Sequence, residues 1–294
     1  MNCADESALG KAPLGFTDRI PDHDFQRSSQ HTMSTLALIA IAVGNTRTHV
    51  ALFNNDELEQ CTHIDNEDRA RVVELVTSSW KASADSERRA IAVSSVNEPV
   101  SKALCSVIED QIGEEVYRIG QDLPVPITMA LDPEATPGMD RLLNAAAAWS
   151  TLKQACVVID AGTAVTIDFI DGEGTFHGGV IAPGAQMQLD ALHSSTENLP
   201  EIDFSAPKGE PYGRNTASAM QRGVYHGIRG LVWRMIEEFA TAYEAFPLVV
   251  ATGGDAPALF EGDELINRMV PDLELRGIAV SVRHALTENI DADE

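Results

Sequence analysis

The chain has 294 residues, 44% of them hydrophobic, and a formal net charge of −24 from 21 basic and 45 acidic side chains. A chain of this length can bury one large core or two smaller ones, and its negative charge argues against nucleic acid as a partner. No apolar run approaches the ~20 residues of a membrane-spanning helix, so no membrane association is expected. The four scattered cysteines favour a reduced, cytoplasmic protein without a structural zinc site.

The first 32 residues are polar and show neither helical nor strand periodicity. They also lack the apolar centre of a secretory signal. We therefore expect residues 1–32 to be a disordered extension or the product of a start placed too far upstream, with Met33 as an alternative start. At the other end, residues 289–294 are expected to form a short acidic tail.

Between these ends, predicted strands and helices alternate, which is typical of an α/β fold. Strands are predicted over residues 37–43, 49–53, 89–94, 116–119, 155–160, 164–170, 175–181 and 248–252. Helices are predicted over residues 69–81, 100–112, 141–153, 185–193 and 217–243. The last helix is expected to break near residues 227–230, and Glu57 and Glu59 are assigned to a solvated loop.

One motif occurs twice, as IAVGNTRT at 41–48 and as IDAGTAVT at 159–166, with Asp160 lying 118 residues after Ala42. The matched pairs are Ile41 with Ile159, Gly44 with Gly162, and Thr48 with Thr166. Each copy opens a strand–turn–strand hairpin. The repeat predicts duplicated α/β halves, residues 33–148 and 149–288, that face each other across a cleft.

The first turn has the composition of a phosphate site. Gly44 lets the backbone approach a ligand, Asn45, Thr46 and Thr48 offer side-chain donors, and Arg47 adds a planar cation. An ordinary β-hairpin is the alternative, since Asn and Gly are common in such turns. The chain lacks GxxxxGK[ST] and GxGxxG motifs, so a nucleotide site here would belong to a different fold from those two.

The second turn keeps an acid, Asp160, ahead of Gly162 and Thr163. A carboxylate at the end of a buried strand, beside a phosphate turn, is well placed to bind a cation or orient a water. A turn-capping aspartate is the simpler alternative.

A third motif, PGMDRLLNAAAAW at 137–149, opens an Ala-rich helix. Asp140 is either the helix N-cap or an acid that accepts a hydroxyl proton, beside Arg141 as a cation for a carboxylate or phosphate. The two roles are compatible.

Three further motifs are GGVIAPG at 178–184, YGRNTASAM at 212–220 and VVATGGDA at 249–256. The second predicts a helix start capped by Asn215 or Thr216, with N–H groups that can face an anion. The third is a buried strand running into a Gly-Gly turn, which either lies against an adenosine or is a plain tight turn.

In chain order, these motifs resemble those of the type III pantothenate kinases, a family of the acetate kinase/sugar kinase/Hsp70/actin superfamily. The resemblance rests on GNTRT (44–48), GMDR (138–141), DAGTAVTID (160–168), GGVIAPG (178–184), GRNTASAMQRG (213–223) and ATGG (251–254), and runs from about Met33 to about residue 285. It implies two actin-like (ribonuclease H-like) halves around a nucleotide cleft. It also implies ATP with Mg²⁺, K⁺ or NH₄⁺ as monovalent cation, and a homodimer with pantothenate bound at the subunit interface.

The resemblance assigns roles to individual residues. The phosphate-binding turn falls on Ala42, Val43, Gly44, Asn45, Thr46, Arg47, Thr48 and His49, and an ATP-contacting threonine falls on Thr163. The substrate motif falls on Gly138, Met139, Asp140 and Arg141, with Asp140 as general base. Asp160 would hold the monovalent cation, and Thr216 would contact pantothenate.

Two positions depart from the family pattern. The family's first turn reads D-x-G-N-T, and this chain has Ala42 at the acid, which removes one carboxylate from a site that binds Mg²⁺–phosphate. The family often has a tyrosine before the G-x-D-R motif, in the substrate pocket, where the nearest residue here is Ala130.

The leading hypothesis is therefore ATP-dependent phosphorylation of pantothenate, the first step of coenzyme A synthesis. Ala42 motivates a second one, a catalytically impaired paralogue that binds nucleotide or pantothenate in a regulatory role. A third is a kinase of the same fold that acts on another small hydroxy acid or sugar.

Overall fold

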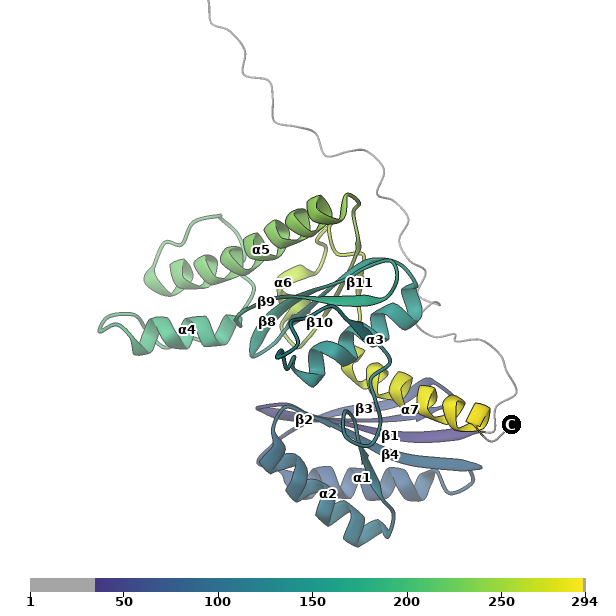
Figure 1. The fold of residues 1–294 in the computed structure, drawn as a ribbon. Helices are drawn as coiled ribbons and strands as arrows, with labels where there is room; N and C mark the ends of the chain where they lie inside the picture. Colours follow the sequence, from purple (N-terminus) through teal and green to yellow (C-terminus); the bar gives the residue numbers. More distant parts are fainter. Residues whose placement is uncertain (1–34, 293–294) are drawn as a thin grey trace, which may run out of the picture.

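A computed structural model describes residues 35–292, with side chains described to residue 287, as two β-sheets with helices on their faces (Figure 1). The expected extension, residues 1–32, and Met33 lie outside the described residues. The strands are β1 Leu36–Val43, β2 Arg47–Asn54, β3 Glu57–Asp65, β4 Arg88–Ser95, β5 Val116–Arg118, β6 Thr128–Met129, β7 Cys156–Ala161, β8 Ala164–Ile170, β9 Thr175–Pro183, β10 Leu248–Thr252 and β11 Arg268–Met269. The helices are α1 Arg69–Ala82, α2 Glu98–Ile112, α3 Met139–Leu152, α4 Ala185–Ser194, α5 Thr216–Tyr243, α6 Ala256–Phe260 and α7 Leu273–Ala292.

The two sheets repeat one topology. The first has the order β3-β2-β1-β4-β5, and the second has the order β11-β10-β7-β8-β9-β6. In each, the central strand pairs antiparallel with the strand that follows it and parallel with a later one, β1 with β4 and β7 with β10. Apart from β6, which pairs with the edge strand β9, the second sheet matches the first strand for strand. The duplicated actin-like halves predicted from the repeat are confirmed.

The turns of the two repeated hairpins differ by one residue. In the first, Ala42 lies opposite His49, and the Gly44 N–H donates to the Arg47 carbonyl at 2.9 Å. In the second, Asp160 lies opposite Thr166, and the Gly162 N–H donates to the Ala164 carbonyl at 2.9 Å. The sequence match of Thr48 with Thr166 is therefore wrong in space: the residue opposite the first strand's acid position is His49, and Thr48 lies opposite Val43.

Both faces of the first sheet are covered. Ile39, Ile41 and Val43 pack with α1 and α2 on one face. Leu38, Ala40 and Ala42 pack on the other face against Leu275, Ile278 and Ala279 of α7. Figure 1 shows α7, the last helix of the chain, lying between the two sheets beside α3. The far end of the sequence thus completes the core of the first half.

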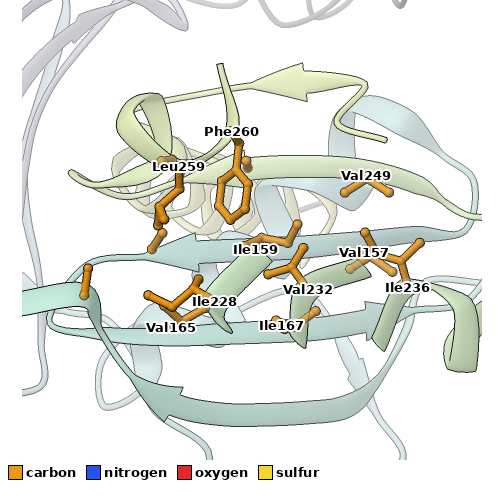
Figure 2. Close-up of a cluster of buried hydrophobic side chains, with 14 of the residues drawn as sticks. Val157, Ile159, Val165, Ile167, Ile228, Val232, Ile236, Val249, Leu259 and Phe260 are labelled. Atoms are coloured by element: carbon orange, nitrogen blue, oxygen red, sulfur yellow. The ribbon is translucent and has the colours of Figure 1, made fainter. Parts of the chain in front are cut away.

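The second sheet packs one face on α5. Ile228, Val232 and Ile236 of this helix lie over Val157, Ile159 and Ile167, with Leu259 and Phe260 of α6 closing the end of the cluster (Figure 2). The buried side chains of α5 recur every four residues, from Met220 to Ala240. This continuous stripe explains why α5 is unbroken and why the break expected near residues 227–230 is wrong.

Several predicted elements need correction. Glu57 and Glu59 belong to the edge strand β3, where exposed polar residues face solvent, and not to a loop. The sequence reading missed α6, β11 and α7, and α7 continues through residues 289–292, where we expected a tail. Helix α3 runs across the expected division at residues 148 and 149, so that division stays a prediction. Among residues 35–292, no helix combines the length and apolarity needed to span a membrane.

Candidate active site

The conformation of the first turn is fixed by hydrogen bonds to an asparagine that the sequence analysis did not predict. Asn66, after β3, donates its side-chain amide to the carbonyls of Gly44 (2.9 Å) and Asn45 (3.1 Å), and its backbone N–H donates to Thr46 O at 3.0 Å. The Thr48 hydroxyl donates to Asn66 Oδ1 at 2.8 Å and is fully buried. In the structure this hydroxyl braces the turn, and the assignment of Thr48 to ATP binding stays a prediction.

The remaining residues of this turn divide into a buried and an exposed set. Val43 is buried against α1 and α2. Asn45, Thr46 and Arg47 are exposed, and Arg47 forms a 3.1 Å ion pair with Asp65, also exposed. The exposed residues are the ones that can meet a ligand.

His49, at the end of the turn, carries no charge at neutral pH. It stacks on His63 of β3 with ring centroids 4.2 Å apart. Burial, together with the nearby His63 and Arg47, lowers the pKa of His49 to about 4. Its ring would add hydrogen bonds to a phosphate site, but no cation.

Asp140 lies in the first turn of α3, whose N-cap is Gly138. Its Oδ1 accepts from the Arg141 N–H at 2.9 Å, so the carboxylate is held at the positive end of the helix without being the cap itself. A Cβ at Gly138 would come within 2.4 Å of that oxygen. Glycine is therefore required here for Asp140 to keep this position.

The Arg141 guanidinium is already paired. Its Nε donates to both carboxylate oxygens of Asp168 on β8 at 3.1 Å, and Nη2 bonds Asp168 as well. The side chains of Arg141 and Asp168 are only 13% and 3% exposed. The sequence reading treated Arg141 as a free cation for substrate, whereas the structure shows a guanidinium fixed by a buried acid.

Asp160, at the end of β7, faces α3. The Asn144 side-chain amide donates to its Oδ2 at 3.0 Å, while Asn144 Oδ1, in a side chain that is 2% exposed, has no partner among the described residues. Burial and the Asp140 charge raise the pKa of Asp160 to about 6. Among the residues that the structure describes, no backbone N–H donates to Asp160, so the turn-cap alternative lacks support.

Backbone turns close over Asp160. A Cβ at Gly253, in the Gly-Gly turn after β10, would lie 2.3 Å from the Ala161 carbonyl and 2.5 Å from Asp160 Oδ1, and its φ of +94° favours glycine. Burial raises the pKa of Asp255, and the positive charge of Arg47, in the first turn, partly offsets this rise. The Gly-Gly turn thus faces both hairpin turns, including the exposed Thr163.

Glu274 is the acid that the sequence reading missed entirely. It lies at the start of α7, where its Oε1 accepts from the buried Ser94 hydroxyl of β4 at 3.2 Å. Burial, followed by the charges of Asp140 and Asp160, raises the pKa of Glu274 to about 8. These effects on Glu274 indicate that it lies near Asp140 and Asp160.

Met139 and Thr216 complete the predicted set. The Met139 side chain packs against Gly120 and belongs to the core beneath α7. Thr216 is exposed at the start of α5, which Asn215 caps by a capping box with Ser218. Figure 1 shows α4 and the beginning of α5, where Thr216 lies, projecting away from α3, which carries Asp140.

The donor set suits hard cations. Carboxylate and amide oxygens are the ligands of Mg²⁺ and similar ions. In the part of the chain that the structure describes, no three His, Cys, Asp or Glu side chains converge as a metal site. A divalent ion would therefore need oxygens from a bound phosphate to complete its coordination.

Two ribonuclease H-like halves with an acidic cleft and paired hairpin turns define a protein of the acetate kinase/sugar kinase/Hsp70/actin superfamily. A sequence model described as type III pantothenate kinase matches residues 38–238. The chain belongs to this family.

Curated relatives agree with the assignment. The chain is 31% identical to the type III pantothenate kinase of Syntrophotalea carbinolica over 254 residues, covering 83% of this chain and 97% of that protein. It is 32% identical to that of Rhodospirillum centenum over 251 residues, covering 82% and 96%. A solved Campylobacter jejuni structure, described as a Baf family transcriptional activator, matches with a TM-score of 0.55 at 19% identity, covering 85% of this chain and 99% of that one. That last likeness concerns the fold alone.

Proposed function

We propose that this protein transfers the γ-phosphate of ATP to the primary hydroxyl of pantothenate, giving 4′-phosphopantothenate, the first step of coenzyme A synthesis. Family membership supports the reaction. The observation that carries it to particular residues is the convergence of Asp140 and Asp160 between two hairpin turns. These are the acids that the family pattern places at the proton acceptor and at the monovalent cation.

Asp140 is the proposed proton acceptor. Its Oδ1 is held by the Arg141 N–H, which leaves Oδ2 for the substrate hydroxyl. An acid so placed orients the attacking oxygen and takes its proton as the phosphoryl group moves. The buried Arg141–Asp168 ion pair fixes the first turn of α3, so its role is to position Asp140 as well as to contribute one cation to the site.

ATP is proposed to lie between the two turns. Asn45, Thr46 and Arg47 present exposed donors from the first turn, and Thr163 presents one from the second. Backbone N–H groups of such turns, together with a guanidinium, suit a polyphosphate. Bound Mg²⁺ would supply charge neutralisation on the phosphates.

Asp160 and Asn144 are proposed to hold the monovalent cation. Asp160 has no cationic partner among the described residues, and Asn144 Oδ1 is buried without a donor. Buried oxygens of this kind fit K⁺ or NH₄⁺, which would satisfy Asn144 and lower the cost of charging Asp160.

A coupled assay tests the reaction: ATP, Mg²⁺ and pantothenate, with and without K⁺ or NH₄⁺. We expect turnover that needs pantothenate and that increases with the monovalent cation. Correctly folded protein with no turnover above background would refute the proposal. The same assay with other small hydroxy acids and sugars distinguishes a pantothenate kinase from a kinase of the same fold with another substrate, which would turn over one of these compounds faster than pantothenate.

We further propose a homodimer in which Thr216 of one subunit reaches the pantothenate site of the other. The support is that Thr216 is the first residue of α5, whose beginning projects away from α3, the helix that carries Asp140 (Figure 1). Exposed apolar side chains on these projecting elements, Met187 (45%) and Leu192 (37%) of α4, suit burial in an interface.

Mixing two variants tests the shared site. In a mixed dimer of Asp140→Asn and Thr216→Ala subunits, one of the two sites is wholly unmodified if the site is shared. Random exchange in a two-fold dimer then restores about a quarter of the wild-type sites, measured at low pantothenate. Activity equal to the mean of the two parents would refute a shared site.

A further inference from the structure

The first turn of this family site lacks its acid, because the chain has Ala42 where the family pattern has aspartate. The Ala42 side chain is buried on the face of β1 that packs against α7. The neighbouring strand and the helix that covers this face bring another carboxylate to it.

Ser94 is the register partner of Ala42 on the neighbouring strand β4. Adjacent strands lie roughly 4.8 Å apart, and paired side chains of parallel strands point to the same face. Glu274 Oε1 accepts from the Ser94 hydroxyl at 3.2 Å. The Glu274 carboxylate therefore accepts from the register neighbour of position 42, on the face of the sheet to which a side chain at position 42 would also point.

The contact between α3 and α7 determines where the Glu274 side chain lies. A Cβ at Gly277 would lie 2.3 Å from the Leu143 carbonyl, so the two backbones touch there. Asp140 and Glu274 each lie three residues before this contact, close to one turn of helix. The crossing thus holds both carboxylates on the cleft side, and replacing Gly277 would separate the helices.

The charges in the site are not balanced. Asp140, Asp160, Asp168 and Glu274 are four acids, and Arg141, the cation that pairs within this group, is committed to Asp168. Independently, the buried Asn144 Oδ1 beside Asp160 has no donor among the described residues. Both observations indicate that the site is built to receive cations from outside the chain.

We propose that Glu274 supplies the carboxylate that the first turn lacks at Ala42, and that it holds the divalent cation that accompanies ATP. The inference rests on the proposed function and concerns this chain's own pairing of Ala42 with Glu274. The acid has moved from the end of β1 to the start of α7, while its position beside the turn is kept.

The test compares the affinity of the protein for a non-hydrolysable ATP analogue with Mg²⁺ and with EDTA, by calorimetry. In Glu274→Gln, which keeps the acceptor for Ser94, we expect the Mg²⁺-bound analogue to bind about 10- to 100-fold more weakly. The metal-free analogue should bind about equally to both proteins, because without Mg²⁺ there is no ion for Glu274 to hold. A merely structural role would weaken both.

Two matched variants complete the design. Glu109→Gln removes one acid from α2, where its Oε1 accepts from the Val116 N–H, and should leave both affinities unchanged. The exchange variant Ala42→Asp/Glu274→Gln returns the acid to β1, and should recover Mg²⁺-dependent binding to within about threefold of wild type. Ala42→Asp alone crowds two carboxylates together and should gain nothing.

Unchanged Mg²⁺-dependent binding in Glu274→Gln would overturn the inference, and so would an exchange variant no better than Glu274→Gln. Pantothenate turnover, measured in parallel, separates this inference from the proposed function. If pantothenate is turned over and Glu274→Gln leaves the Mg²⁺-dependent affinity for the analogue unchanged, the inference is overturned and the proposed function stands. Glu274-dependent binding without pantothenate turnover supports the inference and overturns the proposed substrate.

Discussion

Glu274→Gln should make the metal-free protein more stable, and increasingly so as the pH rises. In the folded chain the pKa of Glu274 is about 8, against 4.5 ordinarily. Its folded-state pKa is raised, so the folded state binds the proton more tightly than the unfolded state. Stability is therefore lost as the pH rises from about 4.5 to about 8.

The size of the effect follows from the shift. At about 1.4 kcal/mol per pH unit, the difference between a pKa of about 8 and the ordinary 4.5 gives about 5 kcal/mol as an upper bound. Relaxation and water penetration around the buried carboxylate reduce this to about 2–4 kcal/mol. The charges of Asp140 and Asp160, which raise the pKa of Glu274 together with burial, are present in both proteins.

The assay is urea unfolding of both proteins at pH 5, 6, 7, 8 and 9, without nucleotide or divalent metal. The difference in unfolding free energy should grow from near zero at pH 5 and level off above pH 8. A difference that stays constant across this range, or a variant less stable than wild type at pH 8, would refute the account of Glu274 as an uncompensated buried acid.

Three further outcomes are expected. Asp140→Asn should lower pantothenate turnover by about 10²- to 10⁴-fold and leave the affinity for an ATP analogue within threefold; equal loss of both would argue against a proton acceptor. Asp168→Asn should lower the unfolding free energy by about 3–5 kcal/mol, because it leaves Arg141 buried and incompletely paired. Asp168→Leu combined with Arg141→Met should recover most of this loss. Additive losses in urea unfolding would contradict this. Thr216→Ala should raise the KM for pantothenate about tenfold through one lost hydrogen bond and leave the KM for ATP unchanged, and a change in both would point to a structural role.

Apolar runs and a repeated motif were enough to predict the hairpins, the central strands and α5, because burial dictates their side chains locally. The edge strand β3 was missed, since its polar residues become a strand only by pairing with β2. Helix α7 was missed because Glu274, Arg276 and Gly277 interrupt its apolar pattern. In the structure, Glu274 serves the cleft and Gly277 allows the contact with α3.

The site shows the same division. Asp140 and Asp160 were predicted from motifs, and the structure brings them together. Asp168 was hidden within a strand read as apolar, and its importance depends on Arg141, which lies 27 residues earlier in the chain. The braces supplied by Asn66 and the acid supplied by Glu274 arise from tertiary contacts, which local pattern does not encode.

The position of α7 has a consequence for synthesis. The face of β1 that carries Leu38, Ala40 and Ala42 is covered by Leu275, Ile278 and Ala279, which are translated after every strand of the first sheet. At roughly 5–20 residues per second, the first sheet waits on the order of tens of seconds for this cover. During that interval an apolar surface is open on the nascent chain, and the acidic cleft does not yet exist, because one of its walls is still inside the ribosome.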